Sequence, residues 1–354
     1  MSIRTIKPIK SLHKEFNVPG DKSISHRSII LGAISNGTTK VSNFLDGADC
    51  KATISCFREM GVTITKEKDL VIIKGVGLTG LKKPTRTLET GNSGTTTRLL
   101  AGLLAGQNFT SILSGDESLN QRPMNRVMIP LKEMNAQIES LKQNGCAPLK
   151  ISPATLSGIS YHSPVASAQV KSAILLAGLY AKESTTVIEP ILSRNHTELM
   201  MEAFGVTLSS KLLEDGKTSV TLTPGNSLKA MDIHVPGDIS SAAYLIAAGL
   251  LLPNSEIIVR NVGINPTRDG FLKVVKDMGG NITLLNKKIC AGEATADILV
   301  KSSKLKATTI EGSIIPTLID EIPIIAVMAS VATGTTSIND ASELAVKETN
   351  RIQT

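Results

Sequence analysis

Hydrophobic and polar positions repeat one local pattern five times along the chain. Each copy begins with a polar or Gly/Pro-rich turn, continues into an apolar helix rich in small residues, and ends in a β-branched strand. The copies read PGDKSISHRSIILGAISNGTTKVSNF from Pro19, TGNSGTTTRLLAGLLAGQNFTSIL from Thr90, VASAQVKSAILLAGLYAKESTTVI from Val165, PGDISSAAYLIAAGLLLPNSEIIV from Pro236 and PTLIDEIPIIAVMASVATGTTSI from Pro316. Their starts recur about every 70 to 80 residues, which is longer than most solenoid periods.

A second helical pattern follows the copies, the last one excepted, and ends in a hydrophobic residue and Gly. Examples are ATISCFREMGVTI, ELMMEAFGVTL and FLKVVKDMGGNITLL. Glycine at this place commonly ends a helix in the left-handed conformation. Alternating apolar strands such as LVIIKGV come next. The sequence therefore predicts β/α units in the order helix, strand, helix, strand, strand.

The first helix of each unit is apolar around its whole circumference, as in SAILLAGLY and SAAYLIAAGLLL. A helix of this kind is buried on every side, so helices are expected inside and sheets outside. Core packing explains these small residues, and any function is expected at the helix N-terminal ends. The fifth unit's second helix is expected to begin near KETNRIQT. If the architecture needs six units, the rest of the fifth and the sixth are absent, which would leave one domain open.

Composition restricts the possible classes of function. A chain of 354 residues is long enough for two domains. The hydrophobic content of 41% is ordinary for a soluble globular protein, and the low aromatic content of 3% argues against a base-stacking RNA binder. The net charge of +7 favours anionic partners and leaves phosphates, carboxylates and nucleic acid open.

Cysteine spacing and apolar runs bear on the compartment. The four cysteines show no C-x-x-C pattern, so neither a zinc site nor a disulfide framework is indicated and a reducing cytosol is expected. The segment from Met1 to Phe16 lacks the apolar core of a signal peptide. The longest apolar stretch, from Ala242 to Pro253, is shorter than the roughly 20 residues of a membrane span. We therefore expect a cytoplasmic protein with no membrane contact.

The first repeat, with VPGDKSISHRS at its start, combines a helix start with cations. Asp21 or Ser23 can cap the helix, and Lys22, His26 and Arg27 lie around its first turns. Free N–H groups and two cations at a helix start form an anion site. A capped helix whose basic residues face water explains this segment equally well.

The second repeat supplies glycines and arginines. Gly91 and Gly94 let the backbone approach a ligand closely, and Arg98 follows one turn later. Arg122 lies further on in GDESLNQRP, and its guanidinium can bind a carboxylate or phosphate with two hydrogen bonds. An exposed loop arginine is the alternative interpretation of Arg122.

The third repeat places Ser167 and Gln169 at a helix start, with Lys171 following. Arg194 and His196 come after the next strand, in SRNHTE. Hydroxyl, amide and guanidinium groups suit a phosphorylated polyol. Helix capping by Ser167 and ordinary loop positions for the other two remain open alternatives.

The fifth repeat sets Asp320 and Glu321 in an apolar neighbourhood at a helix start, where the helix dipole stabilises a carboxylate and one of the pair is a candidate base. Lys347, Glu348 and Arg351 follow in LAVKETNR, which taken alone also fits a solvated helix face. The fourth repeat, PGDISSAA, has no cation at its helix start and reads as structural. Motifs for nucleotide hydrolysis, hydride transfer, zinc proteolysis and α/β-hydrolase chemistry are absent, so we expect neither a cofactor nor a metal.

Six segments in order resemble the 5-enolpyruvylshikimate-3-phosphate synthase family over the whole chain, in the bacterial branch often called class II. They are PGDKSISHRS, GNSGTTTR, RPM, ASAQVKSAILLAG, LIDEIP and VKETNR. The resemblance implies an α/β, two-domain enolpyruvyl transferase fold of repeated β/α units, an inside-out α/β barrel with five of six units visible. It implies a first lobe of residues 1–18 plus 232–354, incomplete at its C-terminus, and a second lobe of residues 19–231 with three units.

The resemblance also implies transfer of the enolpyruvyl group of phosphoenolpyruvate to the 5-hydroxyl of shikimate 3-phosphate. Carried over by motif, the shikimate 3-phosphate site would contain Lys22, Ser23, Arg27, Ser167, Gln169, Arg194, Asp320 and Lys347. The phosphoenolpyruvate site would contain Lys22, Gly94, Arg122, Gln169 and Arg351. Asp320 would act as the base for the hydroxyl, Glu348 would exchange a proton with the methyl carbon, and Lys22 would offset the charge of the leaving phosphate.

Family members carry further Arg and Lys residues for phosphoenolpyruvate beyond the last residue printed here. The resemblance therefore predicts that this 354-residue chain binds weakly and turns over little or not at all. A monomer suits a hinged clamp. The partners implied are small anionic substrates, without nucleic acid or membrane.

Two alternatives remain open. UDP-N-acetylglucosamine enolpyruvyl transferase shares the fold and uses a loop cysteine, a role that Cys146 in NGCAPL would fit. A non-catalytic phospholigand-binding or nucleic-acid-binding protein is the second, because one fold hosts unrelated functions.

Overall fold

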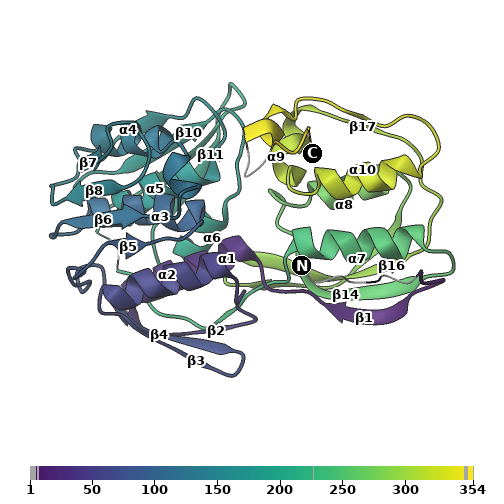
Figure 1. The fold of residues 1–354 in the computed structure, drawn as a ribbon, viewed down its shortest axis with the longest axis horizontal. Helices are drawn as coiled ribbons and strands as arrows, with labels where there is room; N and C mark the ends of the chain where they lie inside the picture. Colours follow the sequence, from purple (N-terminus) through teal and green to yellow (C-terminus); the bar gives the residue numbers. More distant parts are fainter. Residues whose placement is uncertain (1–4, 6–7, 226, 347–349, 354) are drawn as a thin grey trace. The chain divides into compact units, whose positions relative to one another are not determined.

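The structure is a computed structural model that describes residues 5, 8–225, 227–346 and 350–353. The chain forms two compact units, each assembled from separate stretches of sequence (Figure 1). Unit 1 contains Met1–Pro19, Pro236–Ile289 and Ala294–Thr354. Unit 2 contains Gly20–Val235 and Cys290–Glu293.

Unit 2 is built from three modules with one element order, which is helix, strand, helix and two further strands. The first module contains α1 (Lys22–Ile34), β2 (Asn36–Ser42), α2 (Ala48–Glu59), β3 (Thr63–Glu67) and β4 (Leu70–Val76). The second contains α3 (Gly94–Ala105), β6 (Ser111–Ser114), η1 (Leu119–Gln121), α4 (Asn125–Glu133), β7 (Gln137–Ser140) and β8 (Leu149–Ser152). The third contains α5 (Ala168–Gly178), β10 (Thr185–Glu189), α6 (His196–Ala203), β11 (Leu208–Leu212) and β12 (Thr218–Leu222). The predicted order of elements is confirmed in all three.

Each module's sheet gains a fourth, short strand, namely β13 (Ile233–His234), β5 (Leu88–Glu89) and β9 (Ser160–His162). The sheets then have matching orders, β13-β2-β4-β3, β5-β6-β8-β7 and β9-β10-β12-β11. The short strand pairs in parallel with its neighbour, and the other pairs are antiparallel. Because β13 follows the third module yet pairs with β2 of the first, unit 2 closes on itself. This pairing keeps the chain in unit 2 beyond the lobe boundary expected at residue 232.

The first helices of the modules form the interior of unit 2. In α1, 11 of 13 residues are buried. A Cβ at Gly102 in α3 would lie 2.1 Å from the carbonyl oxygen of Ala173 in α5, so only glycine permits this close helix packing. Strands such as β4 alternate between buried and exposed positions. The prediction of helices inside and sheets outside is confirmed for unit 2.

Unit 1 contains a fourth module with the same order. Its elements are β1 (His13–Asn17), α7 (Ile239–Leu251), β14 (Glu256–Gly263), α8 (Gly270–Asp277), β15 (Asn281–Cys290) and β16 (Glu293–Lys301). The sheet has the order β1-β14-β16-β15, with β1 parallel to β14. The residues that join β15 to β16, Cys290–Glu293, belong to unit 2.

The fifth repeat also lies in unit 1, as β17 (Thr309–Ile310), η2 (Gly312–Ile314), α9 (Ile315–Leu318), α10 (Ile322–Ser330), β18 (Ser337–Ile338) and η3 (Ser342–Val346). Its first helix is broken, because Gly312–Leu318 and Ile322–Ser330 meet at 107°. No single helix in the described residues is long and apolar enough to cross a membrane, and this bent pair alone passes such a test on length and composition.

Candidate active site

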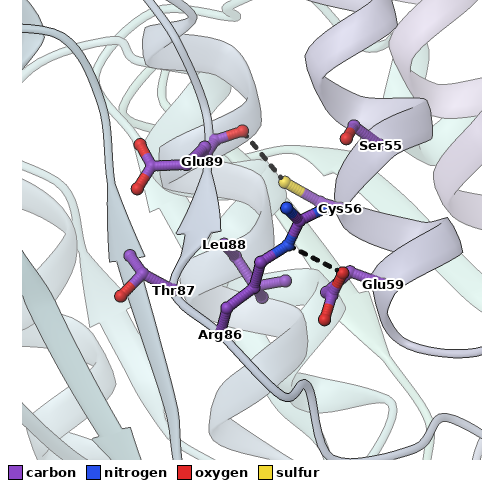
Figure 2. Close-up of a pocket in the computed structure, with 7 residues that line it drawn as sticks. All are labelled: Ser55, Cys56, Glu59, Arg86, Thr87, Leu88 and Glu89. Atoms are coloured by element: carbon purple, nitrogen blue, oxygen red, sulfur yellow. Dashed lines mark hydrogen bonds and ion pairs between the residues drawn. The ribbon is translucent and has the colours of Figure 1, made fainter.

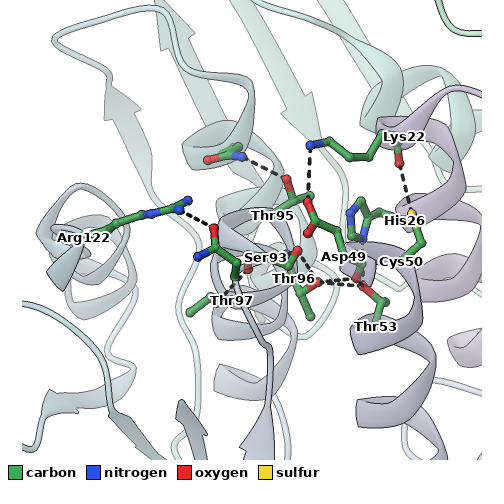
Figure 3. A network of polar contacts seen from close by, with 12 residues as sticks. Lys22, His26, Asp49, Cys50, Thr53, Ser93, Thr95, Thr96, Thr97 and Arg122 are labelled. Atoms are coloured by element: carbon green, nitrogen blue, oxygen red, sulfur yellow. Dashed lines mark hydrogen bonds and ion pairs between the residues drawn. The ribbon is translucent and has the colours of Figure 1, made fainter. Parts of the chain in front are cut away.

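The start of α1 places one lysine at the surface of unit 2. Gly20 forms the preceding turn, where a Cβ would lie 1.9 Å from the carbonyl oxygen of Asn43. Asp21 caps the helix, since its Oδ1 accepts the N–H of Ile24 at 2.9 Å. Lys22 follows with a side chain that is 51% exposed, and its Nζ lies 3.3 Å from Oδ2 of Asp49 (Figure 3). The structure therefore places the Lys22 ammonium beside the first turn of α2 (Ala48–Glu59).

Arg27 is buried one turn further along α1. Its Nε donates to Thr197 Oγ1 at 2.7 Å, its Nη2 donates to Ser172 Oγ at 2.8 Å, and its Nη1 donates to the carbonyl oxygen of Ser23 at 3.0 Å. Burial lowers the pKa of Arg27 to about 10, against the opposing effect of Glu198, so the guanidinium stays charged at neutral pH. Arg27 thus joins α1 to α5 and α6.

The start of α3 combines a glycine with two guanidinium groups. Ser93 caps the helix by accepting the N–H of Thr96 at 3.1 Å. A Cβ at Gly94 would lie 2.8 Å from Nη1 of Arg98 and 3.6 Å from Nη1 of Arg122. The absence of a side chain at Gly94 therefore lets both arginines approach a helix N-terminus, which is an anion-binding arrangement. Arg122 Nη2 donates a hydrogen bond to Oδ1 of Asn92, the residue before Ser93 (Figure 3).

The start of α5 is tied to the start of α3. Gln169 Oε1 accepts from Arg98 Nη1 at 2.7 Å, and Gln169 Nε2 donates to Thr95 Oγ1 at 3.1 Å. Ser167 is the N-cap residue, but its side chain makes no capping hydrogen bond. The capping explanation for Ser167 is therefore wrong. Arg194 lies partly buried just before α6.

Six predicted residues of unit 2 lie in the first turns of three helices linked by side-chain hydrogen bonds, namely Lys22, Ser23, Arg27, Gly94, Ser167 and Gln169, whereas Arg122 follows η1 and Arg194 precedes α6. Arg27 and Ser172 link α1 to α5, while Arg98 and Gln169 link α3 to α5. Among the residues that the structure describes, no three His, Cys, Asp or Glu side chains group as metal ligands would.

Unit 1 holds the predicted carboxylate base. Asp320 lies in the break between α9 and α10, partly exposed, with Oδ1 3.3 Å from Arg351 Nη1 and Oδ2 3.8 Å from Arg268 Nη1. Glu321 is buried, pairs with Arg268 Nη2 at 3.2 Å, and accepts a hydrogen bond from Ser240. The expected apolar neighbours are present, since Leu318, Ile319 and Ile322 are buried, and Arg268 adds a cation that was not expected. Lys347 and Glu348, also predicted here, lie outside the described residues.

Comparison with known proteins settles the family. A sequence profile described as EPSP synthase (3-phosphoshikimate 1-carboxyvinyltransferase) matches residues 6–354. The chain belongs to the EPSP synthase family. It is 54% identical over 346 residues to the protein of Bacillus subtilis (strain 168) named 3-phosphoshikimate 1-carboxyvinyltransferase, covering 98% of this chain and 80% of that one.

Solved structures agree with the profile. The EPSP synthase of Acinetobacter baumannii matches with a TM-score of 0.89 and 46% identity, over 97% of this chain and 77% of that one. The enolpyruvyl transferase NikO from Streptomyces tendae matches with a TM-score of 0.72 and 14% identity, over 93% and 74% of the two chains, and shares the fold. The predicted α/β enolpyruvyl transferase fold is confirmed.

One buried cation of this EPSP synthase family member was not predicted from the sequence. Arg268, only 4% exposed, donates to Ser240 Oγ at 2.8 Å and lies 4.0 Å from Asp238 Oδ1. It therefore supplies a cation to the fourth helix start, which has none of its own. Its only sequence signal is a charged residue in the turn NPTRDG, a pattern common at protein surfaces.

A pocket of about 160 Å³ elsewhere on unit 2 lies apart from these residues (Figure 2). It is lined by Ser55, Cys56, Glu59, Arg86, Thr87, Leu88 and Glu89. Arg86 is already paired with Glu59, at 3.0 Å, and burial, followed by the charge of Glu89, raises the pKa of the Cys56 thiol to about 12. Two carboxylates and a neutral thiol disfavour an anionic substrate, so this pocket is not the substrate site.

Cys146, the loop cysteine of the alternative enzyme class, is 9% exposed. Its Sγ lies 3.5 Å from the carbonyl oxygen of Gln121. A buried thiol turned toward carbonyl oxygens lacks the electropositive, accessible surroundings of a reactive cysteine. Together with the family match, this leaves UDP-N-acetylglucosamine transfer unsupported.

Proposed function

We propose that this protein transfers the enolpyruvyl group of phosphoenolpyruvate to the 5-hydroxyl of shikimate 3-phosphate and releases phosphate, a step of the shikimate pathway to chorismate and aromatic amino acids. Family membership, with 54% identity to a relative named for this activity, supports the reaction. The structural observation that carries it is the hydrogen-bonded junction of three helix starts in unit 2. Its partners are small anionic substrates.

The shikimate 3-phosphate site is proposed in unit 2, at Lys22, Ser23, Arg27, Ser167, Gln169 and Arg194. Asp320, in unit 1, and Lys347, outside the described residues, stay predicted contacts. Arg27 supports the proposal because burial and three hydrogen bonds hold its charge in one orientation. Ser167 supports it because its hydroxyl is not used as a cap.

The phosphoenolpyruvate site is proposed at the start of α3, with Lys22, Gly94, Arg122 and Gln169 as its residues in unit 2. Arg351, in unit 1, stays a predicted contact. Gly94 supports this because it leaves room for Arg98 and Arg122 beside free helix N–H groups. Arginine pairs bidentately with carboxylate and phosphate oxygens, and phosphoenolpyruvate carries both groups.

The proposed chemistry has two balanced stages. The 5-hydroxyl oxygen bonds to C2 of phosphoenolpyruvate, its proton passes to Asp320, and C3 gains a proton from Glu348. The tetrahedral intermediate then loses phosphate from C2 while Glu348 takes a proton back from C3, which restores both the double bond and the protonated Glu348. The ion pairs of Asp320 with Arg351 and Arg268 orient the base, and Lys22 offsets the charge of the leaving phosphate.

We propose further that units 1 and 2 are the two lobes of the enzyme. Monomeric state and cytoplasmic location stay predictions. No step above uses a cofactor.

The test measures substrate binding and phosphate release separately on the 354-residue chain. Calorimetry should detect saturable binding of shikimate 3-phosphate, weakened at least tenfold by Lys22→Met and unchanged by Lys74→Met, which alters an exposed lysine on β4. Phosphate release should require shikimate 3-phosphate and phosphoenolpyruvate together. Release with UDP-N-acetylglucosamine in place of shikimate 3-phosphate would contradict the proposal.

A further inference from the structure

Three charged side chains meet in the interior of unit 2, at a point where α5, β10 and α6 come together. Lys171 on α5 is 2% exposed, and its Nζ lies 2.7 Å from Glu189 Oε2 and 2.7 Å from Glu198 Oε1. We call Lys171, Glu189 and Glu198 the buried triad. A buried ion cluster usually stabilises a fold no better than apolar residues of the same volume, so its role needs a reason beyond stability.

Glu189 of the buried triad holds two backbone segments with one carboxylate. Its Oε1 accepts the N–H of Ser167 at 3.0 Å, and its Oε2 accepts the N–H of Ser193 at 3.4 Å. Ser167 is the N-cap of α5, and Ser193 precedes Arg194 in the segment that leads into α6. These are the two segments of the third repeat for which phosphate contacts are proposed.

The charged Lys171 holds this carboxylate in place. Burial lowers the pKa of Lys171, but Glu198 and Glu189 outweigh that effect and raise the pKa above its ordinary value, so the ammonium remains charged. Oε2 of Glu198 is buried and has no hydrogen-bond partner among the described residues. Glu198 therefore serves the triad through Lys171 and holds neither backbone segment.

The triad also lies next to the contacts that fix Arg27. Ser172 follows Lys171, and Thr197 precedes Glu198. These two hydroxyls lie 2.5 Å apart and both accept from the Arg27 guanidinium. One buried region therefore fixes a cation and two loop backbones.

We infer that Glu189, held by Lys171, is a positioning residue that fixes the Ser167 and Ser193–Arg194 segments at the spacing required to bind the phosphate group of shikimate 3-phosphate. This inference rests on the proposed function. Glu189 touches no substrate atom in this role. It acts through the hydrogen bonds that it accepts from two backbone N–H groups. Its replacement should therefore weaken binding of the ligand's phosphate group more than binding of the shikimate ring.

The test compares shikimate 3-phosphate with shikimate, which lacks the phosphate, in NMR titrations of the full chain. The dissociation constant of shikimate divided by that of shikimate 3-phosphate reports the contribution of the phosphate group alone. Glu189→Gln presents one carbonyl oxygen and one NH₂ group, so it can accept from one backbone segment and repels the N–H of the other. We expect the ratio to fall at least tenfold in Glu189→Gln while shikimate binding changes less than threefold.

Glu198→Gln is the matched control. It removes the same charge from the same triad but leaves both backbone N–H groups with Glu189, so the ratio should stay within threefold of the unaltered chain. Glu189→Asp keeps the charge on a shorter side chain, and it should also lower the ratio if position matters.

Three results separate the possibilities. If Glu189→Gln weakens both ligands equally, or if Glu198→Gln lowers the ratio as much, the triad is merely structural and the inference is wrong. If the unaltered chain binds shikimate 3-phosphate no better than shikimate, the proposed function fails and the positioning role fails with it. Should Glu189→Gln not fold, the triple variant Lys171→Met, Glu189→Gln, Glu198→Gln removes all three charges of the triad together, and an unchanged ratio in it would overturn the inference.

Discussion

His26 makes the stability of unit 2 depend on pH in a calculable way. The ring is fully buried in α1, with Nδ1 2.7 Å from Thr53 Oγ1 and with Nε2 lacking a hydrogen-bond partner among the described residues. Burial, followed by the charges of Lys22 and Arg27 and opposed by Asp21, lowers the pKa of His26 from 6.5 to about 3. An imidazolium needs acceptors at both nitrogens, and this site offers one.

The direction of the change in stability with pH follows from the linkage between proton binding and folding. Because the folded-state pKa is lowered, the unfolded chain binds a proton that the folded chain does not bind between pH 6.5 and about 3. The resulting loss of folding free energy is absent well above pH 6.5 and grows as the pH falls through this window. Between pH 7 and pH 5, His26 alone lowers the free energy of unfolding by about 2 kcal/mol.

Replacement of His26 by Asn removes the titration while keeping a polar atom near the position of Nδ1 for Thr53. The smaller side chain also leaves a cavity, but the cost of a cavity does not change with pH. The free energy of unfolding is measured by urea titration with peptide-resolved hydrogen exchange of α1, at pH 5, 6 and 7. We expect the difference between His26→Asn and the unaltered chain to move by about 2 kcal/mol in favour of the variant from pH 7 to pH 5.

The control is His162→Asn, which replaces an exposed histidine on β9 in the same unit. It should leave the steep acid dependence of the unaltered chain in place. If the curves of His26→Asn and the unaltered chain run parallel from pH 7 to pH 5, His26 does not remain neutral when folded, and the reasoning from its burial is wrong.

Three further predictions concern the two units separately. Gly94→Ala places a methyl group 2.8 Å from Arg98 Nη1, so the dissociation constant of phosphoenolpyruvate in calorimetry should rise at least tenfold while that of shikimate 3-phosphate changes less than threefold; equal losses for both ligands would contradict this. Arg268→Leu leaves Glu321 buried without its ion pair and should lower the free energy of unfolding of unit 1 by about 3 to 5 kcal/mol in urea titration. An unchanged free energy of unfolding would refute this prediction. Asp320→Asn should slow phosphate release at least about 100-fold while shikimate 3-phosphate binding stays within tenfold, and an unimpaired rate would exclude Asp320 as the base.

The sequence predicts the modules well because their signals are local. A helix that is apolar all round and followed by a β-branched strand identifies itself within one window, and the first helices of all five repeats lie where the pattern puts them. Strand pairing is not local at the two places where the chain passes from one unit to the other, after Pro19 and after Val235. The strand before α1 pairs with β14 in unit 1, and the strand before α7 pairs with β2 in unit 2. No sequence window contains both members of such a pair, so the pattern cannot predict it.

The broken helix of the fifth repeat marks another limit. The helix start expected at Asp320 and Glu321 is the start of α10, but α9 before it, which meets α10 at 107°, was not predicted. Arg268 lies far away in sequence and pairs with Glu321 at this turn. The partner of such a buried ion pair is visible only in three dimensions.

Charged side chains in unit 2 fall into two groups, and this division explains why helix starts point to the proposed ligand contacts but not to the residues proposed to orient them. Arg27 and Lys171 are buried and are balanced by Glu189 and Glu198, so these four side chains add no net charge to the site. The half-exposed Lys22 and the N–H groups at the helix starts remain to attract an anion. The proposed binding groups therefore lie near the helix starts, where a turn motif reveals them. Orienting groups need only reach those starts from the core, and Glu189 does so from the end of a strand whose sequence, TTVIE, looks like any other buried strand.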